Sequence, residues 1–356
     1  MRLGIIGLPQ SGKTTLFNAL TRATQPTGAI TGKIEVHTAV VDVPDPRVDR
    51  LSEMFHPKKT IYAKVTYADI AGLDGSAGRT GISGTLLNQL TQMDGFIHVV
   101  RCFEDENVPH PSGSIDPRRD LASMDSEFIL NDLIAVERKL ERLDEERHKG
   151  GGREKAIIER ETELFNRFHN ALSEEHPLRD LEISSEEEKT LAGFGFLSRK
   201  PNLIVLNLAE GQAAPEITYT HKHSLVVPLQ CRLEMDIAQL PPDEAEVFLK
   251  EYGIEEPSLN RMIRLSYDLL GLQSFFTVGP DEVRAWTVRR GATAPEAAGE
   301  IHTDLQKGFI RAEVVAYNDL VTLGGMNEAK AKGKLRLEGK EYIVLDGDVL
   351  NIRFNI

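Results

Sequence analysis

Gly7-Leu8-Pro9-Gln10-Ser11-Gly12-Lys13-Thr14 matches the phosphate-binding pattern G-x-x-x-x-G-K-[ST]. The apolar run at residues 3–6 predicts a buried strand before this loop, and residues 15–20 predict a helix after it. In that setting the loop N–H groups and the positive end of the helix hold a polyphosphate. A glycine-rich turn without a ligand is the alternative, but the lysine and the hydroxyl residue both stand where phosphate chemistry requires them.

We assign nucleotide contacts to this loop and to the residue after it. Lys13 is predicted to reach the β and γ phosphates and to be catalytic, and the Thr14 hydroxyl is predicted to ligate Mg²⁺. The predicted nucleotide-binding residues of this segment are Gln10, Ser11, Gly12, Lys13, Thr14 and Thr15.

A second phosphate-site element follows at the end of a strand-like run. The motif D-x-x-G spans Asp69 to Gly72, where the carboxylate is expected to hold a metal-bound water and the glycine N–H to meet the γ-phosphate. Asp69 is therefore a predicted metal-site residue and Gly72 a predicted nucleotide contact. GTPases of the Ras type carry a water-orienting glutamine next, whereas this chain has Leu73, so hydrolysis must orient its water by another route.

Length and composition limit the classes of protein. The 356 residues allow two or three domains. A net charge of -13 argues against coating of DNA or another polyanion, although it permits a local basic patch. Cys102 and Cys231 have no metal-ligand spacing, and no apolar run reaches membrane-spanning length. We therefore expect a cytoplasmic protein without disulfides, bound to neither membrane nor DNA.

The order of predicted elements indicates an α/β sheet domain interrupted by helices. Strand-like runs lie at residues 3–6, 36–43, 61–69, 96–102, 203–207 and 224–229. Residues 121–197 are highly charged, and two apolar series at helical spacing predict an antiparallel hairpin that turns near residues 150–152. The first series is Ile129, Leu133, Val136, Leu140 and Leu143, and the second is Ile157, Leu164, Phe168 and Ala171. Two surface helices packed on the sheet are the alternative.

The last part of the chain predicts a separate α+β module. Residues 274–278 and 282–286 are expected to be strands, residues 294–307 a helix, and residues 334–344 a hairpin turning at Gly339. The predicted domains are thus 1–120 with 198–272, an inserted hairpin at 121–197, and a C-terminal domain at 273–356.

The chain resembles the YchF-type Obg-like ATPases of the translation-factor GTPase class over essentially its whole length. The segments that carry the resemblance are residues 275–279, 283–287, 324–333 and 346–348. It implies a P-loop nucleotide domain with an inserted coiled coil, a β-grasp TGS domain, ATP with Mg²⁺ as cofactors, and association with ribosomes. Leu73 fits the hydrophobic replacement of the catalytic glutamine in that family.

The expected base-recognition segment also favours ATP over GTP. GTPases read guanine with N-K-x-D, and this chain has Asn207-Leu208-Ala209-Glu210 at the corresponding strand end. The lysine is missing and the carboxylate is one carbon longer, so the guanine clamp is disrupted, while Asn207 is expected to face the adenine edge. We predict nucleotide contacts for Asn207, Leu208 and Glu210; a helix-start asparagine with a nearby glutamate is the alternative.

Three positions bear on hydrolysis. His110, in a proline-rich loop, matches a histidine implicated in hydrolysis in the family and is the second predicted catalytic residue. Gln10 replaces an asparagine that related enzymes use for a monovalent cation. Lys33 stands where the family has the threonine of its first switch, and we expect it to contact the γ-phosphate or to be a solvated lysine.

The leading hypothesis from the sequence is a slow ATPase that binds the ribosome, through both rRNA and ribosomal proteins, with its coiled coil and its TGS domain. A nucleotide-binding adaptor with negligible hydrolysis and a GTPase are the alternatives. The basic segment expected to contact RNA contains Lys330, Lys332, Lys334 and Arg336, with Lys307 and Arg311 upstream.

Overall fold

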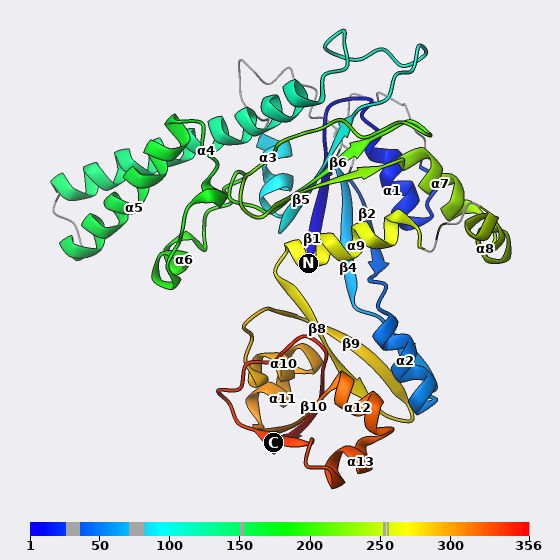
Figure 1. Cartoon of the computed structure of the whole chain (residues 1–356). Coiled ribbons are helices and arrows are strands. Elements are labelled where there is room, and N and C mark those ends of the chain that lie inside the picture. Colours follow the sequence, from blue (N-terminus) through cyan, green and yellow to red (C-terminus); the bar gives the residue numbers. More distant parts are fainter. Residues whose placement is uncertain are drawn as a thin grey trace. The chain divides into compact units, whose positions relative to one another are not determined.

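The computed structural model of the protein describes residues 1–25, 36–70, 82, 84–149, 153–251, 254 and 256–355 (Figure 1). Its contacts divide the chain into an N-terminal unit, Met1–Ala39 with Thr66–Leu259, and a C-terminal unit, Val40–Val65 with Asn260–Ile356. This division differs from the predicted boundaries because residues 40–65 belong with the C-terminal residues. The predicted hairpin belongs to the N-terminal unit.

The N-terminal unit is built on a sheet with the strand order β2-β4-β1-β5-β6-β7. The strands are β1 (Arg2–Ile6), β2 (Val36–Asp42), β4 (Lys64–Ile70), β5 (Gly95–Arg101), β6 (Asn202–Asn207) and β7 (Ser224–Leu229). From β4 to β7 all neighbours pair in parallel, with Ile5 opposite both Asp69 and Ile97. The predicted α/β sheet is confirmed, although the run at residues 61–69 divides between a short strand and β4. Parallel pairing brings the carboxyl ends of β1, β4, β5 and β6 to one edge, where such sheets bind ligands.

Helices of this unit cover both faces of the sheet. Their bounds are α1 (Lys13–Thr21), α3 (Gly84–Thr91), α4 (Pro117–Lys149), α5 (Lys155–Ser173), the 3₁₀ helix η2 (Leu178–Asp180), α6 (Ser185–Leu191), α7 (Cys231–Gln239), α8 (Pro242–Glu251) and α9 (Ser258–Leu269), which continues into the C-terminal unit. Leu86 of α3 and Phe128 of α4 share one core cluster with Phe96 of β5, while α1 packs with α7. In the described part of the chain, no helix is long and apolar enough to cross a membrane.

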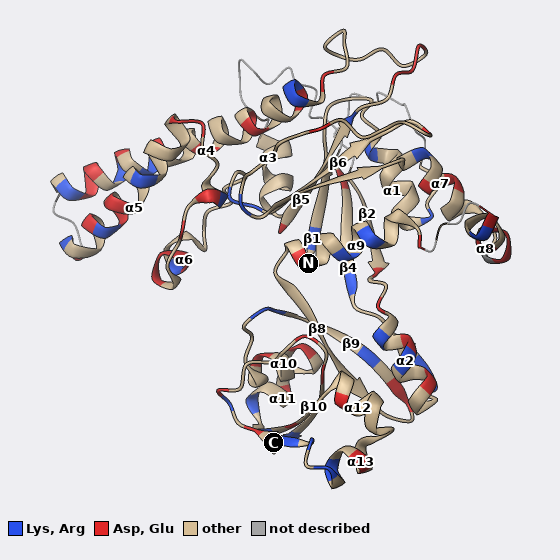
Figure 2. Ribbon diagram, viewed as in Figure 1, with Lys and Arg blue, Asp and Glu red and all other residues tan. Residues whose placement is uncertain are grey.

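The predicted helical hairpin is present as α4 and α5, which project from the sheet in Figure 1 and carry dense charge of both signs in Figure 2. Helix α4 begins at Pro117, four residues before the predicted start, because Asp116 caps it by accepting the N–H groups of Arg118 and Arg119. The second apolar series is displaced by one residue at its start: Ile157 is 41% exposed, whereas Ile158 is buried. The turn at residues 150–152 lies outside the described residues.

Buried side chains hold the base of the hairpin. Val136 of α4 packs with Phe165 and Phe168 of α5 in a cluster that also takes in Leu191 of α6. The Asp132 carboxylate, buried at the same end, accepts the N–H groups of Leu197 at 2.9 Å and Ser198 at 2.7 Å. The hairpin is therefore fixed to its own unit by apolar packing and by one buried carboxylate.

The C-terminal unit has a second sheet, with the strand order β11-β10-β12-β8-β9-β3. Its elements are α2 (Pro46–Phe55), β3 (Lys59–Ile61), β8 (Leu272–Val278), β9 (Glu282–Arg289), α10 (Ala294–Ile301), α11 (Thr303–Lys307), β10 (Phe309–Ala316), α12 (Tyr317–Leu323), α13 (Met326–Ala331), β11 (Arg336–Glu338) and β12 (Asp348–Phe354). The β8–β9 hairpin, the crossing helix α10 and the parallel pairing of β12 with β8 form the expected β-grasp arrangement.

Two local predictions for this unit are wrong. The expected hairpin at Gly339 does not form, because β11 pairs antiparallel with β10 while Ile343 makes a bridge to Thr293. The helix expected over residues 294–307 is divided into α10 and α11 at His302, whose extended backbone ends the first helix and whose ring accepts the Asp304 N–H at the start of the second.

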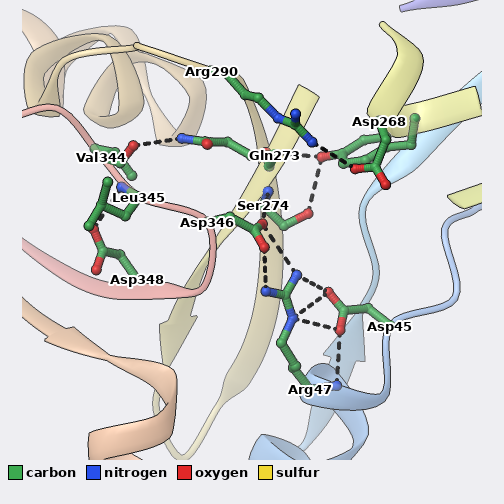
Figure 3. A network of polar contacts seen from close by, with 11 residues as sticks. Asp45, Arg47, Asp268, Gln273, Ser274, Arg290, Val344, Leu345, Asp346 and Asp348 are labelled. Carbon is green, nitrogen blue, oxygen red and sulfur yellow. Dashed lines mark hydrogen bonds and ion pairs between the residues drawn. The ribbon is translucent and has the colours of Figure 1, made fainter. Parts of the chain in front are cut away.

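Residues 40–65 join the C-terminal unit through strand pairing and a partly exposed arginine network. Strand β3 adds to the sheet edge by pairing in parallel with β9. Helix α2 begins with Asp45 as its cap, and Arg47 bridges Asp45 at 2.8 Å and Asp346 at 2.7 Å while its guanidinium lies 5.1 Å from the centre of the Phe276 ring (Figure 3). Asp346 in turn accepts the Ser274 N–H at 3.0 Å.

We predict that Arg47→Met lowers the free energy of unfolding of the C-terminal unit by roughly 1 kcal/mol, discounted because Asp346 is half exposed. The reason is that Asp45 and Asp346 both lose their cation. Trp286 is the only tryptophan in the sequence and lies in β9, so urea unfolding followed by its fluorescence reports on this unit. Lys58→Met breaks an ion pair with Asp281 that is exposed on both sides and should change the midpoint much less. Equal effects of the two changes would contradict the prediction.

Candidate phosphate and nucleotide site

The loop between β1 and α1 needs glycine at two positions. Gly7 has φ +146°, and a Cβ there would lie 2.4 Å from the Val99 carbonyl oxygen. Gly12 has φ +100°, and a Cβ there would lie 2.2 Å from the Asn207 amide nitrogen. Only a residue without a side chain permits this close approach of the loop to β5 and β6. Gln10 also has a positive φ, 61°, and is half-buried.

Lys13 is the first residue of α1 and lies under the loop. Its ammonium donates to the carbonyl oxygens of Gly7 at 3.0 Å and Leu8 at 2.8 Å. Burial lowers the pKa of Lys13 to about 8, while the charge of Asp69 acts in the opposite direction. Gly12 provides no side-chain cap for α1, so the first N–H groups of the helix are left for an anion. Thr15, which follows in the first turn, is half-buried.

Thr14 and Asp69 meet as the sequence predicted for a magnesium site. The Thr14 hydroxyl donates to Asp69 Oδ2 at 2.9 Å, joining α1 to the end of β4. Asp69 Oδ1 and the Ser11 hydroxyl are buried and have no hydrogen-bond partner among the described residues. Burial raises the pKa of Asp69, and the contacts with Thr14 and Lys13 oppose this shift. These atoms fit a metal ion and its waters, because an unpaired buried carboxylate oxygen is costly without one.

Asn207 braces the loop. Its amide nitrogen donates to the Ser11 carbonyl at 2.9 Å, and its amide oxygen accepts the Cys231 N–H at 3.2 Å at the start of α7. The side chain is buried and is hydrogen-bonded at both ends within the protein. The expectation that Asn207 faces the adenine edge stays a prediction.

Leu208 and Glu210 differ in solvent exposure. The Leu208 side chain is buried in a cluster with Val100, Leu121 and Leu206, so it packs into the core, whereas Glu210 is exposed. The turn after Leu208 is held by Gln212, which accepts the Ala209 N–H at 2.8 Å and donates to the Cys102 carbonyl at 2.8 Å. Sequence reasoning missed Gln212, since one of its two partners, Cys102, follows β5 and is 110 residues away.

His110 is fixed rather than free. Its side chain is 4% exposed, with Nε2 2.9 Å from Asp120 Oδ2 and Nδ1 accepting the Ser112 N–H at 3.1 Å. Asp120 also receives the Arg119 guanidinium at 2.8 Å. Because Nδ1 is an acceptor, the ring proton sits on Nε2 and is donated to Asp120. Asp120 and Arg119 were not expected from the sequence.

Several predicted site residues lie outside the described part of the chain. They are Gly72, Leu73 and Lys33. The described residues contain no group of three His, Cys, Asp or Glu side chains arranged for a metal ion. A magnesium ion here would therefore depend on the Thr14 hydroxyl, waters held by Asp69, and phosphate oxygens.

We predict that Asn207→Ala weakens ATP and GTP binding by the same factor, because the lost contact acts on the Ser11 carbonyl of the loop and not on a base. The expected loss is about fivefold to tenfold, typical of one buried hydrogen bond. Titration calorimetry with both nucleotides measures it. Gln212→Ala, which removes contacts of the neighbouring turn, serves as the control. A loss confined to ATP would place Asn207 on the adenine edge instead.

Comparisons with known proteins identify the family of the chain. A family model described as a 50S ribosome-binding GTPase matches residues 2–139, and a model for the C-terminal domain of YchF GTPases, described as a protein of unknown function, matches residues 272–355. The "Ribosome-binding ATPase YchF" of Haemophilus influenzae is 42% identical over 365 residues, covering 100% of this chain and 99% of the relative. That of Bacillus subtilis is 40% identical over 372 residues, covering 99% of both.

More distant relatives cover the whole chain as well. "Obg-like ATPase 1" of rice, Oryza sativa subsp. japonica, is 35% identical over 368 residues, covering 100% of this chain and 92% of the relative. The solved structure of the Schizosaccharomyces pombe YchF GTPase has a TM-score of 0.83 and 30% identity, covering 99% of this chain and 97% of that one. Full-length identity of about 40%, together with the shared fold, shows that the chain belongs to the YchF family.

Proposed function

We propose that this chain is an ATPase that binds the ribosome, as the names of its relatives describe them, and that it works in the cytoplasm, where ribosomes are found. The observation that carries the proposal is the meeting of Lys13, Thr14 and Asp69 at the carboxyl edge of the sheet. The Ser11 hydroxyl and one Asp69 oxygen are buried there without a partner among the described residues. A triphosphate and a magnesium ion would supply the missing partners.

The predicted site residues have separate roles in binding the phosphates and the magnesium ion. Gln10, Ser11, Gly12 and Thr15 belong to the loop and helix N-terminus that would cradle the phosphates, with Gly72 at the γ-phosphate. Bound at Thr14 and through water at Asp69, magnesium would neutralise charge on the β and γ phosphates.

His110 is our candidate for positioning the attacking water, because Leu73 cannot do so. This role requires the ring to exchange its bond to Asp120 for a bond to water. The need for that exchange favours slow turnover, and a nucleotide-binding adaptor with negligible hydrolysis remains the second candidate on the same ground.

The buried position of the Leu208 side chain supports a preference for ATP over GTP. A lysine at this position in GTPases packs along guanine, but the Leu208 side chain is part of the core and offers neither charge nor a stem to the base. Replacing Leu208 by lysine would bury a charge, so that change is not a clean test of base choice. Glu210 is exposed and free to approach a base edge.

Ribosome contact is proposed for the α4–α5 hairpin and the C-terminal unit. Two of the four basic residues expected to contact RNA are engaged in ion pairs within the protein. Lys334 pairs with Asp319 at 3.2 Å, and Arg336 pairs with Glu338 at 3.3 Å. Lys330 and Lys332 are exposed at the end of α13. These two lysines are the better candidates for rRNA phosphate contacts.

We predict that Lys13→Ala lowers ATP affinity at least tenfold while the fold is kept, since a charge-assisted contact is worth roughly 1.5–3 kcal/mol. Proton uptake should identify the group. Burial lowers the pKa of Lys13 to about 8, and a bound phosphate would raise it again. ATP binding at pH 8.5 should therefore take up a proton, and ATP affinity should fall as the pH rises through 8. Calorimetry in two buffers of different ionisation enthalpy measures this uptake.

Lys200→Ala is the matched control for Lys13→Ala. Burial also lowers the pKa of Lys200 to about 8, and its ammonium likewise donates to two carbonyl oxygens, those of Thr91 and Met93. This variant should lose stability but keep both ATP affinity and proton uptake. Normal ATP binding by Lys13→Ala, or no uptake by the unaltered protein, would refute the assignment.

We predict that reversing Lys330 and Lys332 to glutamate reduces co-sedimentation with ribosomes and flattens its salt dependence by about 0.7–0.9 per lost phosphate contact. ATP affinity should not change, since both lysines belong to the C-terminal unit and the phosphate loop to the N-terminal unit. Lys58 and Lys59, exposed in the same unit, provide a double reversal with the same change in net charge. If that control loses as much binding, net charge and not this segment governs association.

A further inference from the structure

Arg101 is a buried cation beside the candidate nucleotide site that the proposed function does not use. It is the last residue of β5, is 2% exposed, and lies opposite Asn207 in the parallel pairing of β5 with β6. Asn207 is the residue that braces the phosphate loop at Ser11. Arg101 is therefore one strand away from the loop contact, at the edge of the sheet where ligands bind.

Strand alternation places Arg101 on the side of the sheet that carries the loop. Its neighbours Val100 and Cys102 pack in the cluster that contains Leu121 of α4 and Leu206 of β6. Successive residues of a strand face opposite sides, so Arg101 faces away from α4, together with its pairing partner Asn207. Gly7 of the phosphate loop approaches the Val99 backbone two residues earlier on the same strand.

The guanidinium of Arg101 is only partly satisfied. Nε donates to the Phe103 carbonyl at 3.1 Å, and the guanidinium carbon lies 4.5 Å from the centre of the Phe103 ring. Nη1 is buried and has no hydrogen-bond partner among the described residues. Burial lowers the pKa of Arg101, and Asp105 opposes this shift only through its charge.

Arg179 provides the contrast within the same chain. It is equally buried and also has one donor without a described partner, Nε, but its Nη2 pairs with the Asp125 carboxylate at 3.0 Å and its Nη1 donates to the Ser198 carbonyl at 3.2 Å. Arg101 forms no ion pair with any residue that the structure describes. A buried guanidinium without a carboxylate and with an unused donor is an expensive arrangement for a structural arginine, and an acceptor from a ligand would offset that cost.

We propose that Arg101 contacts the bound nucleotide at its nucleoside end, donating from Nη1 to an acceptor atom of the base or ribose. The proposal rests on the proposed nucleotide site and names a further specificity residue within it. Arg101 pairs with Asn207 at the end of β6, where the base is expected, and this is why we place its contact at the nucleoside. The position where GTPases carry a lysine is Leu208 here, and its side chain is buried in the core, so the end of β6 offers no cation to the nucleoside. Arg101 supplies a cation from the neighbouring strand.

The test is calorimetric titration of the full chain with Mg·ATP and Mg·ADP after Arg101→Met and Arg101→Lys. A contact at the nucleoside is shared by both nucleotides, so Arg101→Met should weaken ATP and ADP by the same factor, about tenfold, as for one hydrogen bond from a charged donor. Arg101→Lys keeps the charge but loses the planar guanidinium, so its affinities for ATP and ADP should lie between those of the unaltered protein and those of Arg101→Met. Inorganic tripolyphosphate, which has no nucleoside, should bind both variants as it binds the unaltered protein.

Control variants separate this proposal from the proposed function and from loss of fold. Lys200→Met removes a half-buried cation of the N-terminal unit and should leave ATP and ADP affinity unchanged. Lys13→Ala should weaken ATP and tripolyphosphate together, and its failure to do so would overturn the nucleotide site itself. Unchanged ATP and ADP affinity in Arg101→Met, or a loss confined to ATP, would overturn the role of Arg101 alone. If Arg101→Met does not fold, Arg101→Lys decides by the same comparison of the two nucleotides.

Discussion

The contact on which the nucleotide site depends is the double hydrogen bond of Asn207. One side chain ties the Ser11 carbonyl of the phosphate loop to the Cys231 N–H that begins α7, and Gly12 must be glycine because the Asn207 amide occupies the space of its Cβ. The loop is thereby fixed to the end of β6, a strand whose residues follow it by almost two hundred positions. The Asn207 side chain therefore links the phosphate loop, the end of β6 and the start of α7, and a change at Asn207 affects all three.

The path of the chain adds a second constraint. Thr14 and Asp69 form the proposed magnesium site, but the residues between them leave the N-terminal unit after Ala39 and return at Thr66. In between they form α2 and β3, which belong to the C-terminal unit through the Arg47 network and the β3–β9 pairing. The covalent connection from the phosphate loop to Asp69 therefore passes through the unit proposed to contact the ribosome. A domain boundary drawn only from the C-terminal sequence misses this segment.

The sequence predicted those features that local patterns control. The strand, loop and helix around residues 7–14 and the alternation of strands follow from short apolar runs and glycine positions, and the Thr14–Asp69 pair follows from parallel strand order. Features controlled by distant contacts were missed or misjudged. The pairing of β11 with β10, the caging of His110 by Asp120 and the core position of Leu208 each depend on residues that no local pattern connects. Arg101 carried a signal, since it ends a strand at the ligand-binding edge, but its unpaired donor appears only in the fold.

The hydrogen bonds of Lys13 give a physical reason for the proposed site to favour a polyphosphate. Lys13 already donates to the carbonyl oxygens of Gly7 and Leu8, so an incoming anion must replace two hydrogen bonds before it gains any affinity. A single weak anion gains little from that exchange, because each bond to the ammonium is worth roughly 1.5–3 kcal/mol. A triphosphate with magnesium compensates at several points together: it meets Lys13, the first turn of α1, the Ser11 hydroxyl and, through the metal, the unpaired oxygen of Asp69. Selection at the phosphate end therefore follows from the number of partners that one ligand satisfies together, and the nucleoside end is left to discriminate between bases.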